Sequence, residues 1–244
     1  MRDIYTASRR PDGLPERLGG DDTLVMGVLN VTPDSFSDGG EHDDAPSAID
    51  HGLRLIEQGA AIVDVGGEST RPGAPRVDED EELRRVLPVV AALAAEDVVV
   101  SVDTMRASVA AASIEAGALI VNDVSAGRAD EDMGREMGRL RTSRGTPPVF
   151  IAMHWRGHSD VMNELAVYED VARDSAAELA ERLQSLREAG VEDRFLVADP
   201  GLGFSKTGEQ NWQLLADWPT MASHGLPLLI GASRKRFVST LGVD

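Results

Sequence analysis

Short apolar runs recur along the chain, and each is followed by a polar loop and then by a longer stretch of helix-favouring residues. This alternation predicts repeated βα units whose strands lie parallel to one another. Each run is almost continuously hydrophobic, as expected for strands that are buried on both faces of a parallel sheet. The predicted strands are 23–29, 61–65, 98–102, 119–121, 149–153, 195–198 and 226–230.

Helices are predicted between these strands, and glycine follows several of them. Gly59, Gly117 and Gly190 come where a C-terminal helix cap is expected, because glycine adopts the left-handed backbone conformation that ends a helix. The predicted helices are 45–58, 78–95, 107–116 and 168–189.

Two architectures suit this alternation, a closed (β/α)₈ barrel of the TIM type and an open, doubly wound sheet. The polar segments after the strands favour the barrel, because there all of them meet on one face, whereas a doubly wound sheet sends them to two sides of a switch point. We expect one domain over residues 21–244, preceded by a flexible tail over residues 1–20. The polar segments are 30, 66–71, 103, 122–123, 154–156, 199–206 and 233–236.

The composition excludes several kinds of partner. The 244 residues carry a formal net charge of -18, so the surface should repel nucleic-acid phosphates and anionic membranes. No apolar stretch approaches the roughly 20 residues that a membrane span needs. The chain has no cysteine, so nothing indicates an oxidising compartment, and a cytoplasmic location fits best. Its two lysines, Lys206 and Lys235, both lie in glycine-containing segments near the C-terminus.

Several strand-end segments match the motifs of one enzyme family. They begin with MGVLNVTPDSFSDGG at 26–40 and GAAIVDVGGESTRPGA at 59–74 and continue with SVDT, VNDVSAG, MHWR, DPGLGFSKT and GASRKRF. Over 24–237 the chain resembles dihydropteroate synthases. The resemblance implies a TIM-type barrel that condenses (7,8-dihydropterin-6-yl)methyl diphosphate with p-aminobenzoate, giving 7,8-dihydropteroate and diphosphate in folate biosynthesis.

The resemblance also implies a pterin site. A pterin ring offers adjacent hydrogen-bond donors and acceptors along its edge, which carboxylates and carboxamides can recognise in pairs. Asp103, Asn122 and Asp199 match the residues that bind the ring, and Lys235 matches a lysine that also reaches it. Strand-end Asp and Asn often only cap the following helix, which is the structural alternative. Met153 and Phe204 are expected to form apolar walls.

The leaving diphosphate requires positive charge and hydrogen-bond donors, because charge accumulates on it as the bond to the pterin methylene breaks. By resemblance, Thr70, Arg71, Ser233 and Lys235 contact this substrate, and Asn30 is the protein ligand of Mg²⁺. One neutral amide cannot hold magnesium alone, so we expect the metal to bind with the diphosphate.

The loop after the first strand and the loop 68–74 match the mobile substrate-covering loops of the family. Phe36 and Pro72, one in each loop, are expected to line part of the arylamine pocket. Closure of such loops would exclude water from a reactive cation.

The expected catalytic residues are Asp103, Asp199 and Lys235, acting on a pterin cation that forms when diphosphate departs. Asp103 and Asp199 would stabilise its positive charge without abstracting a proton. A protein nucleophile is not expected, since the chain has no cysteine and His154 has no obvious serine partner.

The resemblance ends before the family's eighth strand, whose flanking helices and arginine–histidine segment are also missing from the chain. A seven-stranded barrel would have two open edges, so we expect weak stability, lost activity or rescue by oligomerisation if 244 residues is the natural length, with a homodimer as the expected assembly. If the chain is a fragment of a longer protein, the resemblance stands unmodified. Two alternatives to the synthase stay open: a non-catalytic pterin-binding paralogue and a pterin-dependent methyltransferase domain.

Overall fold

Six strands form one parallel sheet in which each strand pairs with the next one along the chain. The computed structural model describes residues 10–32, 45–68, 76–158, 161–162 and 164–241. The strand order never reverses, which is the order of a (β/α) barrel and excludes the doubly wound alternative. Among the described residues the barrel is not closed, since β1 and β6 are not paired. The strands are β1 (Met26–Asn30), β2 (Ile62–Gly66), β3 (Val100–Asp103), β4 (Ile120–Asp123), β5 (Val149–Met153) and β6 (Leu196–Asp199).

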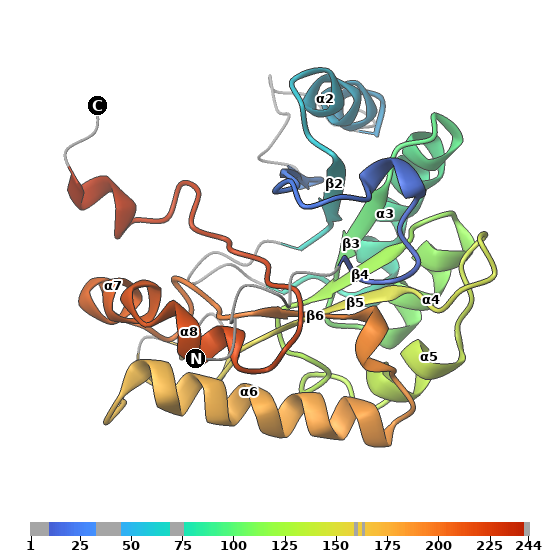
Figure 1. The fold of residues 1–244 in the computed structure, drawn as a ribbon. Coiled ribbons are helices and arrows are strands. Elements are labelled where there is room, and N and C mark those ends of the chain that lie inside the picture. The colour runs from blue at the N-terminus through green and yellow to red at the C-terminus, as the bar shows by residue number, and fades with distance from the viewer. Residues whose placement is uncertain (1–9, 33–44, 69–75, 159–160, 163, 242–244) are drawn as a thin grey trace.

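Helices cover the outer face of this curved sheet (Figure 1). Four predicted helices are confirmed within a few residues, and Gly59, Gly117 and Gly190 have the expected positive φ angles of 104°, 116° and 100°. No described helix is long and apolar enough to span a lipid bilayer. The helices are α2 (Ala45–Glu57), α3 (Glu79–Ala95), α4 (Ala107–Glu115), α5 (Met133–Arg139), α6 (Val171–Glu188), α7 (Gly208–Ala216) and α8 (Trp218–Ala222), with the 3₁₀ turns η1 (Glu16–Leu18), η2 (Asp193–Phe195) and η3 (Val238–Leu241).

The seventh predicted strand, 226–230, lies beside β6 but is not a strand. It makes a single parallel bridge, between Leu228 and Ala198, with hydrogen bonds from Ala198 N to Pro227 O and from Leu229 N to Ala198 O, both at 2.9 Å. Pro227 has no N–H to donate to a ladder, which limits the pairing. Arg234 has a φ of 59°, which a right-handed helix cannot include. Only η3 follows it among the described residues.

Alternation along the strands separates two apolar layers. Side chains two residues apart share a face, so Ile62, Ile120, Ile151 and Val197 all point inward and pack together. Their neighbours on the opposite face, such as Phe150, belong to the larger core under the helices. The next inward-facing residue toward the carboxyl end, two positions further along, is polar in three of these four strands. The inner face is therefore apolar at its base and polar at the end where the loops meet.

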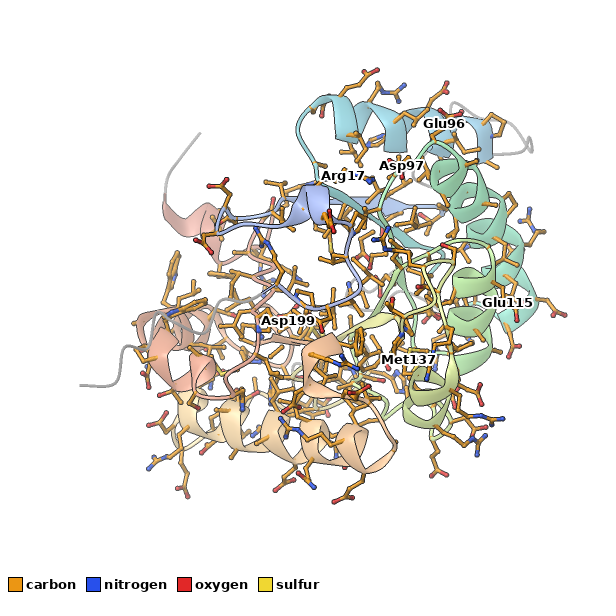
Figure 2. All side chains as sticks on the ribbon, turned by 45° about the vertical axis from the view of Figure 1, so that its right-hand side comes forward. Arg17, Glu96, Asp97, Glu115, Met137 and Asp199 are labelled. Atoms are coloured by element: carbon orange, nitrogen blue, oxygen red, sulfur yellow. The ribbon has the colours of Figure 1, made fainter. Side chains whose placement is uncertain are left out.

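Part of the expected N-terminal tail is folded against the base of the barrel. Leu18, 9% exposed, joins the inner apolar cluster. Arg17 forms an ion pair with Asp97 at 3.0 Å, and the two residues lie together in Figure 2. Asp12 N donates to Arg194 O at 2.7 Å. These contacts correct the prediction of a flexible segment for residues 10–20, while residues 1–9 lie outside the described residues.

Candidate active site

The polar residues predicted from the strand ends lie together at the carboxyl ends of the strands, and those of β1 to β4 share one level of the register. Backbone pairing places Asn30 opposite Gly66, Gly66 opposite Asp103, and Asp103 opposite Asn122. A Cβ atom at Gly66 would lie 3.4 Å from Asp103 Oδ2 and 3.8 Å from Asn30 Oδ1, so this glycine leaves space between the two side chains. On the other side, Asp199 is paired with Met153.

Both predicted acids resist ionisation in the folded protein. Asp103 is partly exposed, and its pKa is raised well above the usual value, first by burial and then by the nearby charges of Asp64, Glu82 and Asp123. Burial likewise raises the pKa of Asp199 to about 6, although Oδ1 accepts a hydrogen bond from Gly201 N at 2.7 Å. A ligand that donates hydrogen bonds or carries positive charge would favour the ionised form of both groups.

Asn122 is held by a residue that the sequence did not identify as part of the site. Its Nδ2 donates to Oδ2 of Asp64 at 2.9 Å, and both side chains are buried. A carboxylate only accepts hydrogen bonds, so this contact turns the amide nitrogen toward Asp64 and the amide oxygen away from it. A carboxylate inside the otherwise apolar run 61–65 was the signal that could have found Asp64.

Lys235 reaches the site from the segment after the seventh predicted strand. Its Nζ lies 4.2 Å from the ring centroid of Phe204, and its pKa is lowered, first by burial, against the opposing effect of Asp199 and Asp103. Gly203 has a φ of 77°, and a Cβ there would lie 3.0 Å from Lys235 Cδ, so the lysine passes close over this backbone. Ser233 is exposed two residues before Lys235.

Met153 and Phe204 differ in exposure. Met153 is only 2% exposed and therefore belongs mainly to the core beneath the site. The ring of Phe204 is partly exposed next to Lys235, as expected for a residue that lines a pocket.

A partly buried ionic network lies after β2, around the buried carboxylate of Glu82. Arg106 pairs with Glu82 and, at 3.1 Å, with Glu68, and Arg76 pairs with Glu68 at 3.1 Å. Thr104 Oγ1 donates to Glu82 Oε1 at 2.6 Å. A cavity of about 10 Å³ lies between these residues and Asp103. The sequence did not predict this network, which links Glu68 and Arg76 to Arg106 at the start of α4.

Four predicted substrate residues lie outside the described residues. Thr70, Arg71 and Pro72 fall within 69–75, and Phe36 falls within 33–44. The predictions for these residues therefore stay predictions.

Asn30 offers a single exposed amide to a metal ion at the end of β1. In the described part of the chain, no cluster of three or more His, Cys, Asp or Glu side chains could hold an ion. One amide oxygen fits a hard cation whose remaining ligands come from substrate oxygens and water.

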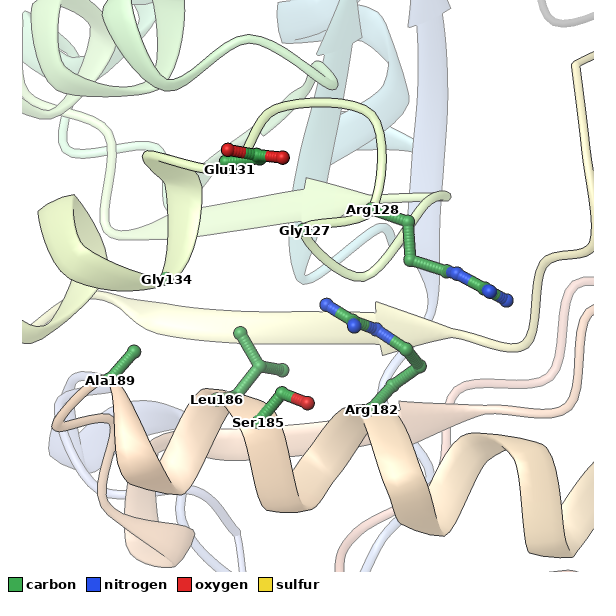
Figure 3. A pocket seen from close by; sticks show the side chains of 8 residues that line it. All are labelled: Gly127, Arg128, Glu131, Gly134, Arg182, Ser185, Leu186 and Ala189. Carbon is green, nitrogen blue, oxygen red and sulfur yellow. The ribbon is translucent and has the colours of Figure 1, made fainter.

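The described residues also form a hollow of about 330 Å³ between α5 and α6, on the outside of the barrel. Figure 3 shows the residues that line it, among them Arg182 on α6 and Arg128 on the segment before α5. None of the predicted strand-end residues lines this hollow, so it is separate from the candidate active site.

Comparison with known proteins identifies the family. The sequence profile of the family described as pterin binding enzyme matches residues 26–243. The dihydropteroate synthase of Mycobacterium leprae is 50% identical over 218 residues, covering 89% of this chain and 75% of that protein. The dihydropteroate synthase of Escherichia coli K12 is 42% identical, with the same coverage.

Solved structures agree with the sequence comparison. The structure of Xanthomonas albilineans dihydropteroate synthase with 4-aminobenzoic acid has a TM-score of 0.81 at 40% identity, covering 98% of this chain and 78% of that chain. The structure of the same enzyme with 7,8-dihydropteroate has a TM-score of 0.79 at 38% identity, covering 98% and 79%. From its sequence, its strand order and its strand-end residues, the chain belongs to the dihydropteroate synthases of the pterin-binding enzyme family.

Proposed function

We propose that this chain is a transferase that condenses (7,8-dihydropterin-6-yl)methyl diphosphate with p-aminobenzoate, giving 7,8-dihydropteroate and diphosphate at the carboxyl ends of the strands. The observation that supports this site most directly is the register. It brings Asp103 and Asn122 side by side and places Asp199 two residues beyond their level, all at the carboxyl ends of the strands above an apolar base. The related Xanthomonas albilineans enzyme has been solved in complex with 7,8-dihydropteroate, which is the product of this reaction.

Recognition of the pterin rests on three side chains. Asn122, oriented by Asp64, presents its amide oxygen to a ring donor. The Asp199 carboxylate accepts from adjacent ring N–H groups, and these bonds favour its ionised form despite burial. Phe204 forms one apolar wall, with Lys235 lying against its ring.

The reaction breaks the C–O bond to diphosphate and forms a C–N bond to the arylamine. The electron pair of the broken bond leaves with diphosphate, so positive charge develops on the methylene and spreads into the pterin ring. Asp103 and Asp199 stabilise this charge in a pocket with little water, where fixed charges act strongly. The nitrogen of p-aminobenzoate then attacks the methylene carbon and loses a proton.

Departure of the diphosphate is assisted by positive charge from Lys235, with Ser233 nearby as a hydroxyl donor and with Thr70 and Arg71 as further contacts. Asn30 would hold Mg²⁺ together with the diphosphate oxygens, and the ion would neutralise charge on the leaving group.

The test measures diphosphate release by the purified protein with both substrates and Mg²⁺. Release should require each component and should fall sharply in Asp103→Asn and Lys235→Ala. Binding of dihydropterin diphosphate without release would instead identify a non-catalytic pterin-binding protein. Methyl transfer to a corrinoid partner, without diphosphate release, would identify the methyltransferase.

We further propose a cytoplasmic homodimer that sulfonamides inhibit by competing with p-aminobenzoate. Light scattering tests the assembly and would refute it by showing only the mass of one chain. Inhibition kinetics test the competition, which requires the apparent KM for p-aminobenzoate to rise with sulfonamide concentration while kcat stays constant.

A further inference from the structure

Lys206, the second of the two lysines, is buried beside the candidate active site and has no role in the reaction proposed for it. It ends the loop 200–206 after β6 and is 9% exposed. Its Nζ contacts three acceptors: His154 Nδ1 at 2.9 Å, Gly201 O at 3.1 Å and Phe204 O at 3.2 Å. Burial lowers the pKa of Lys206 to about 7, so the side chain is increasingly an ammonium as the pH falls below this value. An ammonium has one hydrogen for each of these acceptors, so its hydrogen-bonding capacity is fully used.

His154 is itself fixed in the tautomer that Lys206 requires. Its Nε2 lies 3.0 Å from Glu178 Oε2. Hydrogen bonding from His154 is the main cause that lowers the pKa of Glu178 to about 2, so the carboxylate accepts and Nε2 carries the proton. Burial lowers the pKa of His154 to about 4, so the ring is neutral near pH 7 and Nδ1 has a lone pair free to accept from Lys206.

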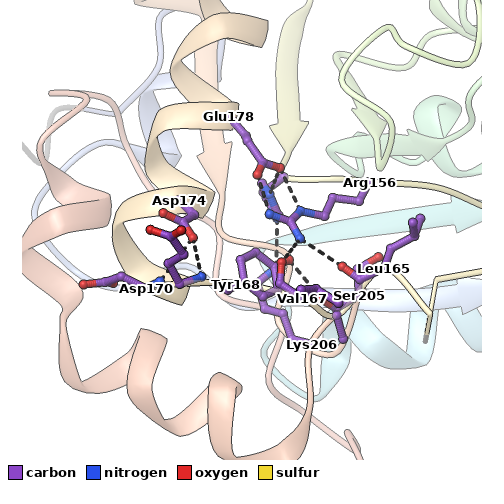
Figure 4. Close-up of polar contacts among 12 residues, drawn as sticks. Arg156, Leu165, Val167, Tyr168, Asp170, Asp174, Glu178, Ser205 and Lys206 are labelled. Carbon is purple, nitrogen blue, oxygen red and sulfur yellow. Dashed lines mark hydrogen bonds and ion pairs between the residues drawn. The ribbon is translucent and has the colours of Figure 1, made fainter.

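Glu178 is held in turn by Arg156. Arg156 Nε donates to Glu178 Oε2 at 2.9 Å, while its guanidinium stacks at 3.7 Å on the ring of Tyr168 (Figure 4). Tyr168 Oη donates to Ser205 O at 3.0 Å, within the same loop as Lys206. The contacts therefore run without a break from helix α6 to the loop after β6.

The loop that Lys206 holds would not keep its shape without support. Gly201, Gly203 and Ser205 all have positive φ angles, of 68°, 77° and 48°. Such a conformation costs energy for serine and persists only where surrounding contacts impose it. Two groups in this loop face the pterin site: Gly201 N, which donates to Asp199 Oδ1, and the ring of Phe204. The residues that provide these groups also provide the two carbonyl acceptors of Lys206.

We propose that Lys206 is a positioning residue for the pterin site: held by His154 and Glu178, its ammonium fixes the loop 200–206 and so places Phe204 and the hydrogen-bond partner of Asp199. This inference rests on the proposed function, because it assigns Lys206 a part in binding the pterin. Lys206 touches no substrate and acts only through the loop and its charge.

The charge of Lys206 has a second effect, on Asp199. Lys235 and Lys206 both lower the pKa of the Asp199 carboxyl, which burial raises to about 6. The titratable or charged groups that face Lys206 are Asp199 from β6, Glu178 from α6, and His154, Arg156 and Tyr168 from the segment between β5 and α6. Removing the positive charge of Lys206 removes one of the two charges that lower the pKa of Asp199, so the pKa of Asp199 should rise further.

The test measures binding of 7,8-dihydropteroate by calorimetry between about pH 5 and 8. In the wild type, binding should weaken as the pH falls through about 6, because Asp199 takes up a proton. In Lys206→Met, affinity at pH 7 should fall by about tenfold, the effect of losing hydrogen bonds from a charged group. The pH at which binding weakens should also move upward.

Controls separate positioning from loss of stability. Leu183→Ala removes a fully buried side chain of α6 that belongs to the core under the helices. It should lower the melting temperature while leaving the affinity for 7,8-dihydropteroate and its pH dependence unchanged. If Lys206→Met does not fold, a pair of His154 variants replaces it. His154→Asn can keep an acceptor near the position of Nδ1 and should retain binding, whereas His154→Leu should lose it.

Unchanged affinity and unchanged pH dependence in Lys206→Met would overturn the inference, as would equal binding by the two His154 variants. Failure of the wild type to bind 7,8-dihydropteroate would instead refute the proposed function. The two failures are therefore distinguishable.

Discussion

Replacing Asp64 with asparagine should make the protein more stable and a poorer pterin binder. Asp64 is 4% exposed, and its Oδ1 makes no hydrogen bond of normal geometry among the described residues, although the hydroxyl of Ser101 on the neighbouring strand acts to lower the pKa of this carboxyl. Burial is the main cause that raises the pKa of this carboxyl. A carboxyl whose pKa is higher in the folded than in the unfolded state lowers stability above the unfolded pKa, and the loss is recovered as the pH falls through the folded value. At neutral pH, Asp64 is therefore a destabilising group.

The size of the expected gain in stability follows from the hydrogen-bond partners of the two carboxylate oxygens of Asp64. One oxygen accepts from Asn122 at 2.9 Å and the other is unsatisfied, which costs about 1–3 kcal/mol for a neutral group and more for a charged one. Asparagine keeps the shape and removes the charge, so we expect a gain of about 2 kcal/mol. For a chain of this size that corresponds to a melting temperature roughly 4–8 °C higher. Asparagine can donate as well as accept, so it no longer fixes the orientation of Asn122, and pterin affinity should fall by about tenfold.

Differential scanning calorimetry at pH 7 and at pH 5 measures the stability, and calorimetric titration with 7,8-dihydropteroate measures the affinity. The stability gain should be smaller at the lower pH, where the wild-type carboxyl becomes protonated. Asp123→Asn is the matched control. Asp123 is fully buried, but it accepts from Ser125 N, Ser125 Oγ and Gly127 N, so this substitution should destabilise. A lower melting temperature in Asp64→Asn, or unchanged pterin affinity, would refute the reasoning.

Four further outcomes are expected. In Asp199→Asn the loss of pterin binding below about pH 6 should disappear, because the titrating carboxyl is gone; the affinity measured at each pH decides this. Gly203→Ala should lower unfolding free energy in urea by about 1–3 kcal/mol and weaken pterin binding, since φ is 77° and the new Cβ would lie 3.0 Å from Lys235 Cδ; full binding would contradict the close approach. Glu82→Gln should cost about 1.5–3 kcal/mol in the same urea assay, because it removes one of the two carboxylates that pair with Arg106 and leaves only Glu68; a change under about 1 kcal/mol would show that the pair is solvated. Chelation of Mg²⁺ should stop diphosphate release but leave 7,8-dihydropteroate binding unchanged, as the product carries no diphosphate; loss of product binding on chelation would contradict a metal bound through the leaving group.

Much of the fold could be predicted because the local signals and the global arrangement agree. Six of the seven predicted apolar runs form strands, because a strand buried on both faces needs continuous hydrophobicity. The candidate pterin residues could be predicted for a related reason: they come directly after the runs, and parallel strands place their carboxyl ends together. The segment 226–230 failed as a strand because hydrophobicity does not reveal whether a backbone ladder can form, and Pro227 removes a donor.

The residues that the sequence did not reveal are those whose role depends on a distant partner. Asp64 and Asn122 are 58 positions apart in the sequence, and His154 and Lys206 are 52 positions apart, so neither contact could be predicted from local spacing. Each of these groups is polar, buried and within or next to an apolar strand, where an unpaired polar group would be costly. That cost is itself a signal: a polar residue in a strand predicted to be buried must have a partner among the polar groups at the same end of the barrel. The backbone pairs Asp103 with Asn122 and Met153 with Asp199, so the buried polar groups around them lie at one end of the barrel. There they can form hydrogen bonds with one another and orient the pterin-binding side chains.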